Sequence, residues 1–218
     1  MSEPPPVRLA RFLDRTTAEG PGERTAIWVQ GCTIRCPGCF NPHLFGARGG
    51  VLVPPSELIG RVLAANTEGL TLLGGEPFEQ ATALAAVAVG VREAGRTVMT
   101  FTGYEYEDLR RRDDAAPLLA ATDLLVAGPF RRDLIDHNRP WVGSTNQQFL
   151  HLTDRMREAA ALPDRLEVTV TASGEVAVNG WADAETLDAL LAGGMLRHGP
   201  AGAGRNRAVP RRPATDVL

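Results

Sequence analysis

The three cysteines of this 218-residue chain lie within eight consecutive positions, CTIRCPGC, as Cys32, Cys36 and Cys39. Thiols gathered at such short range cannot build a framework of structural disulfides. In a reducing compartment, clustered thiols instead bind a metal or carry out redox chemistry. Pro37 and Gly38 permit a sharp turn that brings Cys36 and Cys39 together. The spacing C-x3-C-x2-C therefore predicts one tight loop that presents three sulfur ligands.

Three kinds of site are compatible with these thiols. The first is a zinc site of the Cys3His type, in which His43 supplies the fourth ligand. The second is a redox pair, in which Cys36 and Cys39 act as a C-x-x-C motif. The third is a [4Fe–4S] cluster held by three cysteines, which leaves one iron open to a ligand from outside the protein. The spacing alone leaves all three open.

A second segment, Gly74-Gly75-Glu76-Pro77, follows directly after the apolar residues 70–73. An open iron suits a ligand that chelates through an amine and a carboxylate, and the methionyl end of S-adenosylmethionine carries both. Glycines at a strand end allow the backbone to approach such a ligand closely. The structural alternative is a strand-to-helix turn with Pro77 at the first helical position.

The apolar segments that precede these loops alternate with helical patterns. Strands are predicted at residues 24–30, 70–73, 97–101, 123–127 and 147–150. Three helices are predicted: one begins near residue 54, a second follows the glycines at 74–75 and ends near residue 93, and a third begins near residue 105. Such alternation favours right-handed βαβ units and a parallel sheet. We therefore expect an α/β fold, a partial (open) TIM-like β/α barrel of about five to six βα units with a C-terminal β-hairpin and helix. Sites in such folds lie at the carboxyl ends of strands, where residues 32–39, 74–77, 102–104 and 128–130 fall.

The pattern changes in the last quarter of the chain. Residues 166–178 alternate between apolar and polar about a turn at Ser173-Gly174, which predicts a hairpin, and a short helix is expected over about residues 183–196. From residue 199 the sequence is rich in Gly, Pro and Arg without periodicity, which is typical of disorder. The predicted division is a partial barrel at 1–160, a hairpin-helix extension at 161–198 and a disordered tail at 199–218.

Composition excludes several classes of partner. Hydrophobic residues make up 44% of the chain, enough for a sizeable core. The net charge of −3 and the pI of about 5.8 give no electrostatic reason to expect binding to nucleic acid or to an anionic membrane. No apolar run reaches the length needed to span a bilayer, and the first residues lack the apolar stretch of a signal peptide. The expected compartment is the cytoplasm.

Taken together, the C-x3-C-x2-C triplet and the Gly-Gly-Glu-Pro segment resemble the radical S-adenosylmethionine superfamily. The segments EGPGER (19–24) and WVQGC (28–32) are similar to the opening of glycyl-radical-enzyme activating enzymes. The segments CPGCFNP (36–42), TGY (102–104), GPF (128–130) and GSTNQ (143–147) resemble the anaerobic ribonucleotide reductase activating subgroup. The likeness covers roughly residues 10–150.

This resemblance implies a role for each matching position. Cys32, Cys36 and Cys39 would ligate three irons of a [4Fe–4S] cluster. The positions implied in binding S-adenosylmethionine are Gly74, Gly75 and Glu76 at the methionyl amine, the backbone of Gly38, Cys39 and Phe40 at the adenine, and Thr102 and Asn146 at the ribose or carboxylate. No side chain is expected to act as acid or base, because the abstracting radical derives from the cofactor. Phe40 stands where the subgroup often has His or Tyr, so a polar contact with the cluster is lost there.

The resemblance also implies an activity. Reductive cleavage of S-adenosylmethionine would give a 5′-deoxyadenosyl radical, which removes a hydrogen from a glycine of a partner. The implied partners are a glycyl radical enzyme, specifically an anaerobic ribonucleotide reductase, and an electron donor such as flavodoxin or ferredoxin. Two alternatives stay open: a radical S-adenosylmethionine enzyme that acts on a small molecule or peptide, and a zinc-binding interaction module.

Overall fold

A computed structural model describes residues 4–158, 166–170 and 176–180. Its main feature is a seven-stranded sheet with the strand order β3-β1-β2-β4-β5-β6-β7. The strands are β1 (Val7–Thr16), β2 (Arg24–Val29), β3 (Val51–Val53), β4 (Gly69–Gly74), β5 (Thr97–Thr102), β6 (Leu124–Ala127) and β7 (Gln148–His151). The helices are α1 (Pro55–Ala65), α2 (Ala81–Glu93), α3 (Tyr106–Leu109) and α4 (Ala116–Ala121), with 3-10 turns η1 (Pro42–Leu44), η2 (Pro77–Gln80), η3 (Arg132–Leu134) and η4 (Asp154–Met156).

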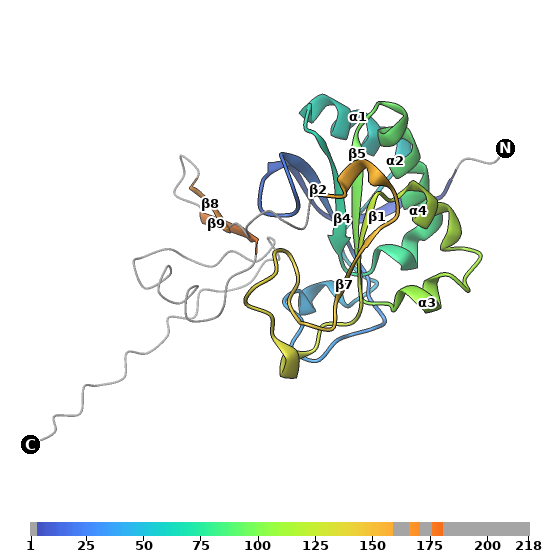
Figure 1. Ribbon diagram of the computed structural model, residues 1–218. Coiled ribbons are helices and arrows are strands. Elements are labelled where there is room, and N and C mark those ends of the chain that lie inside the picture. Colours follow the sequence, from blue (N-terminus) through green and yellow to red (C-terminus); the bar gives the residue numbers. More distant parts are fainter. Residues whose placement is uncertain (1–3, 159–165, 171–175, 181–218) are drawn as a thin grey trace, which may run out of the picture.

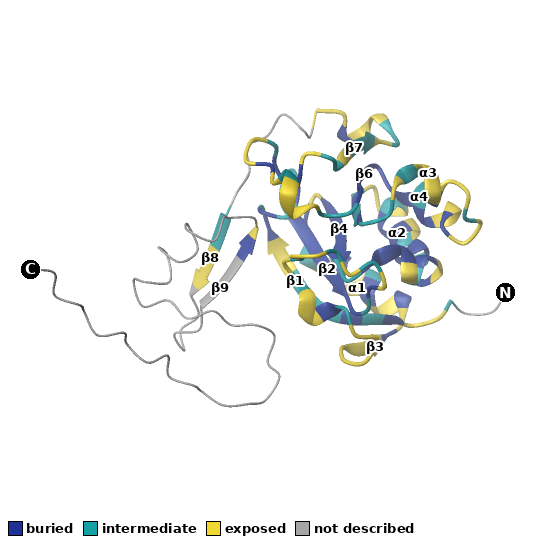
Figure 2. Cartoon of the chain, turned by 90° about the horizontal axis from the view of Figure 1, so that it is seen from below, coloured by how far each residue is buried: buried dark blue, intermediate teal, exposed yellow. Residues whose placement is uncertain are grey.

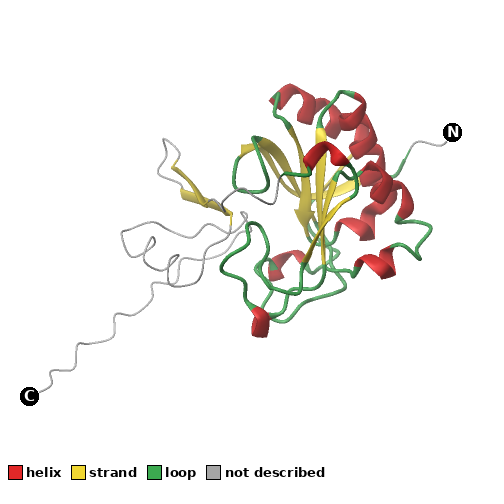
Figure 3. Ribbon diagram, viewed as in Figure 1, coloured by secondary structure: helices red, strands yellow, loops and turns green. Residues whose placement is uncertain are grey.

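Helices α1, α2 and α4 lie together on one side of the sheet (Figures 1 and 3). The main core lies between them and the sheet and includes the fully buried side chains of Ile27, Leu72 and Leu84. Almost every residue of the central strands is buried, so both faces of these strands are covered, and Figure 2 shows them in dark blue. This is the burial pattern of parallel strands at the centre of an α/β sheet. The α/β class predicted from the sequence is confirmed.

The arrangement of the strands corrects the sequence-based prediction of a purely parallel sheet. Strands β2, β4, β5 and β6 are parallel to one another, whereas β1 is antiparallel to both β2 and β3, and β7 is antiparallel to β6. The described residues thus hold four parallel strands rather than five to six βα units. The β3 and β7 strands form the two edges, and no pairing between them closes a barrel.

A buried arginine lies at the amino ends of the central strands. Arg24 is only 1% exposed, and its guanidinium donates to the Thr71 hydroxyl (2.6 Å), the Leu70 carbonyl (2.6 Å) and the Thr97 hydroxyl (3.0 Å). Burial lowers the pKa of Arg24 to about 10, against the opposing effect of the Asp123 and Glu68 charges. A Cβ on Gly20 would come within 2.6 Å of the Arg24 Cδ, so the glycine in EGPGER leaves room for this side chain. The segment therefore helps build the end of the sheet opposite the cysteine loop.

The C-terminal hairpin occurs where the sequence predicted it, as β8 (Leu166–Val170) paired antiparallel to β9 (Val176–Gly180). It is attached to β1 by polar contacts. The Glu167 carboxylate accepts from the Thr16 hydroxyl (2.6 Å) and the Thr17 amide (2.6 Å), and Asn179 accepts from Arg11 (3.0 Å). The predicted turn at 173–174, the helix at 183–196 and the tail at 199–218 lie outside the described residues.

In the part of the chain that the structure describes, no helix combines the length and the apolar character needed to cross a membrane.

Candidate functional site

The cysteine loop begins where β2 ends. Gly31 has a positive φ of 102°, and its amide donates to the Leu44 carbonyl (2.9 Å), while the Cys32 amide donates to the Phe45 carbonyl (3.3 Å). These bonds pin the start of the loop against η1. Cys32 is buried, whereas Cys36 and Cys39 are half-buried.

The predicted sharp turn between the second and third cysteines is confirmed. The Cys39 amide donates to the Cys36 carbonyl (3.1 Å), and Gly38 has a φ of 80°, in the left-handed region that favours glycine. The Asn41 amide in turn points to the Cys39 sulfur (3.4 Å). The loop thus folds back on itself and directs backbone amides toward sulfur.

Burial keeps two of the thiols in the protonated form when no metal is bound. Desolvation raises the pKa of Cys32, against the opposing effect of the Arg35 and Ile34 amides, and the nearby Glu76 and Glu79 charges raise it further. Desolvation likewise raises the pKa of Cys39, against the Asn41 amide. Because the thiolate is the metal ligand, metal binding at these positions must release protons and depend on pH.

The zinc alternative has no preformed site among the described residues. There, no three His, Cys, Asp or Glu side chains are grouped so that they could hold one metal ion, and His43 is exposed on η1. Three cysteines that bind a cluster sit on three different irons, so they need not meet the criterion for a single ion.

The Gly-Gly-Glu-Pro segment at the end of β4 lies against the start of the cysteine loop. The Gly75 amide donates to the Val29 carbonyl (2.8 Å), and the Glu76 amide donates to the Gly31 carbonyl (2.8 Å). A Cβ on Gly75 would lie 2.1 Å from the Gly31 oxygen, and Gly74 has a φ of 110° with Trp28 close by. Both glycines are therefore required by the close approach of two strand ends, whatever else they contact.

The helix-start interpretation of this segment is also correct. Glu76 is the N-cap residue of η2, with its carboxylate accepting from the Phe78 amide (2.9 Å), and Pro77 occupies the first position of the turn. The same carboxylate accepts from the Thr102 hydroxyl (2.8 Å) and the Gly103 amide (2.9 Å) at the end of β5. Glu76 therefore joins the ends of β4 and β5.

Glu76 is buried to 1% exposure, which has an electrostatic consequence. Desolvation raises the pKa of Glu76 from 4.5 to about 7, although the three hydrogen bonds oppose this. The Thr102 hydroxyl proton is directed at Glu76, and its oxygen accepts from the Tyr104 amide (3.1 Å). In this structure Thr102 thus orients the Glu76 carboxylate, and the contact with the ribose or carboxylate of S-adenosylmethionine expected from the sequence stays a prediction.

The loop after β6 completes the surroundings of the cysteines. The Phe40 and Phe130 rings pack at 5.0 Å between centroids, and a Cβ on Gly38 would lie 3.1 Å from the Arg132 side chain. Phe40 nevertheless remains 55% exposed. The Asn146 amide group donates to the Pro129 carbonyl (2.8 Å), while its buried Oδ1 has no hydrogen-bond partner among the described residues.

The loops that carry the predicted site residues thus come together at the carboxyl ends of the parallel strands. At the end of β4, the Glu76 amide donates to Gly31 of the cysteine loop. At the end of β5, Gly103 lies beside Ile34 of that loop. In the loop after β6, the Phe130 ring packs on Phe40. These residues suit a cluster and its ligand in two respects. Three thiols lie on one loop, and a buried acceptor on Asn146 is available to a hydroxyl or amine donor.

Sequence analysis missed one residue of this region, Glu79. Its carboxylate accepts from the Thr33 amide (2.7 Å) and the Thr33 hydroxyl, next to the first cysteine. A glutamate in a turn carries no recognisable spacing signal, so only the fold reveals the contact.

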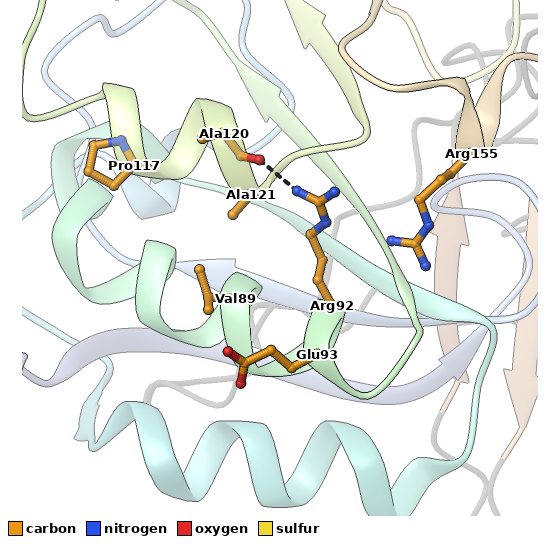
Figure 4. A pocket seen from close by; sticks show the side chains of 7 residues that line it. All are labelled: Val89, Arg92, Glu93, Pro117, Ala120, Ala121 and Arg155. Carbon is orange, nitrogen blue, oxygen red and sulfur yellow. Dashed lines mark hydrogen bonds between the residues drawn. The ribbon is translucent and has the colours of Figure 1, made fainter.

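A cavity of about 450 Å³ lies elsewhere, between α2 and α4 (Figure 4). Two of its lining residues, Arg92 and Arg155, pair with the fully buried Asp123, at 3.6 Å and 3.3 Å. Arg92 also donates to the Ala120 carbonyl (2.6 Å), as the dashed line in Figure 4 marks. Its arginines are engaged in holding the helices to the sheet, and it contains none of the predicted site residues.

Comparison with known proteins places this geometry in context. Residues 18–150 match the family described as a 4Fe-4S single cluster domain. An anaerobic ribonucleoside-triphosphate reductase-activating protein of Enterobacteria phage T4 is 31% identical over 143 residues, which covers 62% of this chain and 88% of the phage protein. A protein of the same name from Haemophilus influenzae is 32% identical and is matched over 93% of its length and 63% of this chain. Another, from Salmonella typhimurium, is 29% identical and is matched over 99% of its length and 67% of this chain. Among solved structures, QueE from Escherichia coli matches 45% of this chain and 52% of its own, with a TM-score of 0.37 and 15% identity, too low to bear on the fold.

Proposed function

Because this chain belongs to the 4Fe-4S single cluster domain family, together with the anaerobic ribonucleoside-triphosphate reductase-activating proteins, we propose that it activates a glycyl radical enzyme. The proposed partner is an anaerobic ribonucleotide reductase. When bound, a reduced [4Fe–4S] cluster supplies an electron for cleavage of S-adenosylmethionine, and the resulting 5′-deoxyadenosyl radical takes hydrogen from a glycine of the partner.

The residues of this chain bind and orient. Cys32, Cys36 and Cys39 would hold a [4Fe–4S] cluster and would leave one iron open to S-adenosylmethionine. The backbone at Gly74 and Gly75 lines the approach to the methionyl amine, and the Glu76 carboxylate fixes the ends of β4 and β5 on which that approach depends.

The nucleoside end of S-adenosylmethionine is assigned to the other side of the cysteine loop. The backbone at Gly38 and Phe40 borders the adenine, and the free acceptor of Asn146 receives a hydrogen bond from the ribose or the methionyl group. Thr102 holds Glu76 in place and is proposed, with Asn146, to contact the ribose or carboxylate. No side chain is assigned as an acid or base.

One observation supports this function most strongly. Three thiols occupy a single loop whose first residue is tied to Gly-Gly-Glu-Pro, through the hydrogen bond from the Glu76 amide to Gly31. A structural zinc site requires a fourth protein ligand. A cluster that binds a cosubstrate requires an open iron beside an accessible strand end.

The proposed architecture is an open, partial barrel formed by residues 1–160, with residues 161–198 as an extension and 199–218 as a tail. The helices α1, α2 and α4 cover one side of the sheet. The open part of this barrel is where a glycine loop of a large partner is proposed to enter. An electron donor such as flavodoxin or ferredoxin is the proposed reductant.

The test begins with metal analysis of anaerobically purified protein. We expect about four irons and four acid-labile sulfides per chain, absorbance near 400 nm, and 5′-deoxyadenosine after reduction with S-adenosylmethionine present. Cys36→Ala should lose the cluster, whereas His43→Ala should retain it. One zinc per chain that depends on His43, without sulfide, would overturn the proposal in favour of an interaction module.

A further assay separates protein activation from small-molecule chemistry. If a reductase partner gains no radical while an added metabolite or peptide is turned over, the chain is a radical S-adenosylmethionine enzyme of another kind. Formation of the radical on the partner supports activation.

A further inference from the structure

The segment immediately after the first cysteine is held by a carboxylate from a different element. Glu79 lies in η2, and one of its oxygens accepts from the Thr33 amide at 2.7 Å, from the Thr33 hydroxyl, and from the Tyr104 hydroxyl at 3.5 Å. Hydrogen bonds to a charged acceptor are roughly twice as strong as those between neutral groups. This contact spans 46 residues of sequence, so it fixes the loop relative to the sheet and not merely within itself.

The turn η2, which carries Glu79, is packed into the core. Pro77 and Phe78 on the same turn are buried, the Glu79 amide donates to the Glu76 carbonyl (3.1 Å), and Glu76 caps the turn. Because Pro77 and Phe78 anchor η2 in the core, the fold sets where the Glu79 backbone lies, and the exposed carboxylate reaches Thr33 from this fixed point.

The residues that follow Thr33 need such a fixed point. Arg35 has a φ of 52°, in the left-handed region that is unfavourable for a side chain other than glycine. A conformation of this kind persists only where its surroundings determine it. The Ile34 and Arg35 amides lie close enough to Cys32 to lower the pKa of its thiol, against the larger effect of desolvation.

We propose that Glu79 is a positioning residue of the cysteine loop, which holds the backbone at Thr33 and thereby fixes the left-handed turn at Arg35 next to Cys32. Hydrogen bonds to cluster sulfurs are among the factors that set the reduction potential. The role thus rests on the proposed function, in that Cys32 is taken as an iron ligand.

The test uses the full chain in two states. In the cluster-free, reduced protein, amide exchange by NMR is compared for wild type, Glu79→Ala and Glu79→Gln, with Glu158→Ala as the control at an exposed position beyond β7. Loss of a hydrogen bond to a charged group should speed exchange of the Thr33 amide about tenfold in Glu79→Ala. Glu79→Gln keeps an acceptor, so exchange should stay within about threefold of wild type, and Glu158→Ala should match wild type.

The reconstituted protein supplies the second reading. Glu79→Ala should change the electron paramagnetic resonance line shape of the reduced cluster, because the amides around Cys32 are no longer fixed. Glu79→Gln should restore the wild-type line shape while raising the reduction potential, because a negative charge is removed. A purely structural residue would not give this split between the two variants.

Several results would overturn the inference. Exchange at Thr33 unchanged in Glu79→Ala, or Gln and Ala behaving alike, would show that the hydrogen bond does not hold the loop. If Glu79→Ala unfolds globally, the test moves to Thr33→Ala, which removes the hydroxyl contact. Unchanged exchange of the Ile34 and Arg35 amides in that variant would overturn the inference and make Glu79 a general stabiliser. If wild type binds no cluster, the proposed function fails while the exchange result still stands, so the two failures are distinguishable.

Discussion

Replacing Glu76 by glutamine should change how stability depends on pH. In the folded protein the pKa of Glu76 is raised from 4.5 to about 7 by burial, so the folded state holds this proton more tightly than the unfolded state. Stability from this group is therefore greatest below about pH 4.5 and falls as the pH rises toward 7. At about 1.36 kcal/mol for each pH unit between the two values, the charged form costs about 3 kcal/mol.

Glu76→Gln removes the cost of burying a charged carboxylate, but it lowers the free energy of unfolding by a constant amount at every pH. The amide oxygen can still accept from Phe78 and Thr102, but the amide nitrogen faces the Gly103 N–H, so one hydrogen bond is lost at every pH. The difference in unfolding free energy between variant and wild type should therefore move by about 2 to 3 kcal/mol in favour of the variant between pH 5 and pH 8.

The assay is urea unfolding of cluster-free protein under reducing conditions, at half-unit steps of pH. Glu158→Gln, an exposed carboxylate, serves as the control, and its curve should run parallel to that of wild type. Parallel curves for Glu76→Gln would refute the reasoning. They would mean that Glu76 titrates normally and that the hydrogen bonds at the ends of β4 and β5 fully offset its burial.

Three further outcomes follow from the contacts of the sheet and its loops. Gly75→Ala would place a Cβ 2.1 Å from the Gly31 oxygen and should destabilise by about 2 kcal/mol or more, whereas Gly60→Ala, with open space around it inside α1, should stabilise by about 0.5–1 kcal/mol; equal melting temperatures would contradict this. Arg24→Met should cost about 3 kcal/mol in urea unfolding, because several buried acceptors lose their donor, and a cost near zero would show that water replaces it. Iron binding at Cys32 and Cys39, whose thiol pKa values are raised by burial, should release protons, so iron affinity in a chelator competition should rise with pH; a flat profile would exclude thiolate ligation.

The sequence contained enough to predict which loops meet at the carboxyl ends of the strands, because its signals are local. Cys32, Cys36 and Cys39 define a loop by spacing alone, and Gly74-Gly75 marks a strand end at which only glycine fits. The apolar runs of β2, β4, β5 and β6 are equally plain, since strands buried on both faces read as continuous hydrophobic segments.

The features that were missed depend on tertiary contacts. The β1 strand, VRLARFLDRT, is only partly buried, and β3 has three residues, so neither has the composition of a central strand. The antiparallel direction of β7 is set by its pairing with β6 and not by its own sequence. The contact between Glu79 and Thr33 likewise joins two segments that no spacing rule connects.

The most direct test of the proposed activity combines the reconstituted protein with its proposed partner. The protein is reduced anaerobically with S-adenosylmethionine in the presence of an anaerobic ribonucleotide reductase, and the partner is examined by electron paramagnetic resonance while 5′-deoxyadenosine is measured. We expect a glycyl radical doublet, lost when the partner glycine is replaced by alanine, with one 5′-deoxyadenosine formed for each radical. Accumulation of 5′-deoxyadenosine without any radical on the partner would contradict the account.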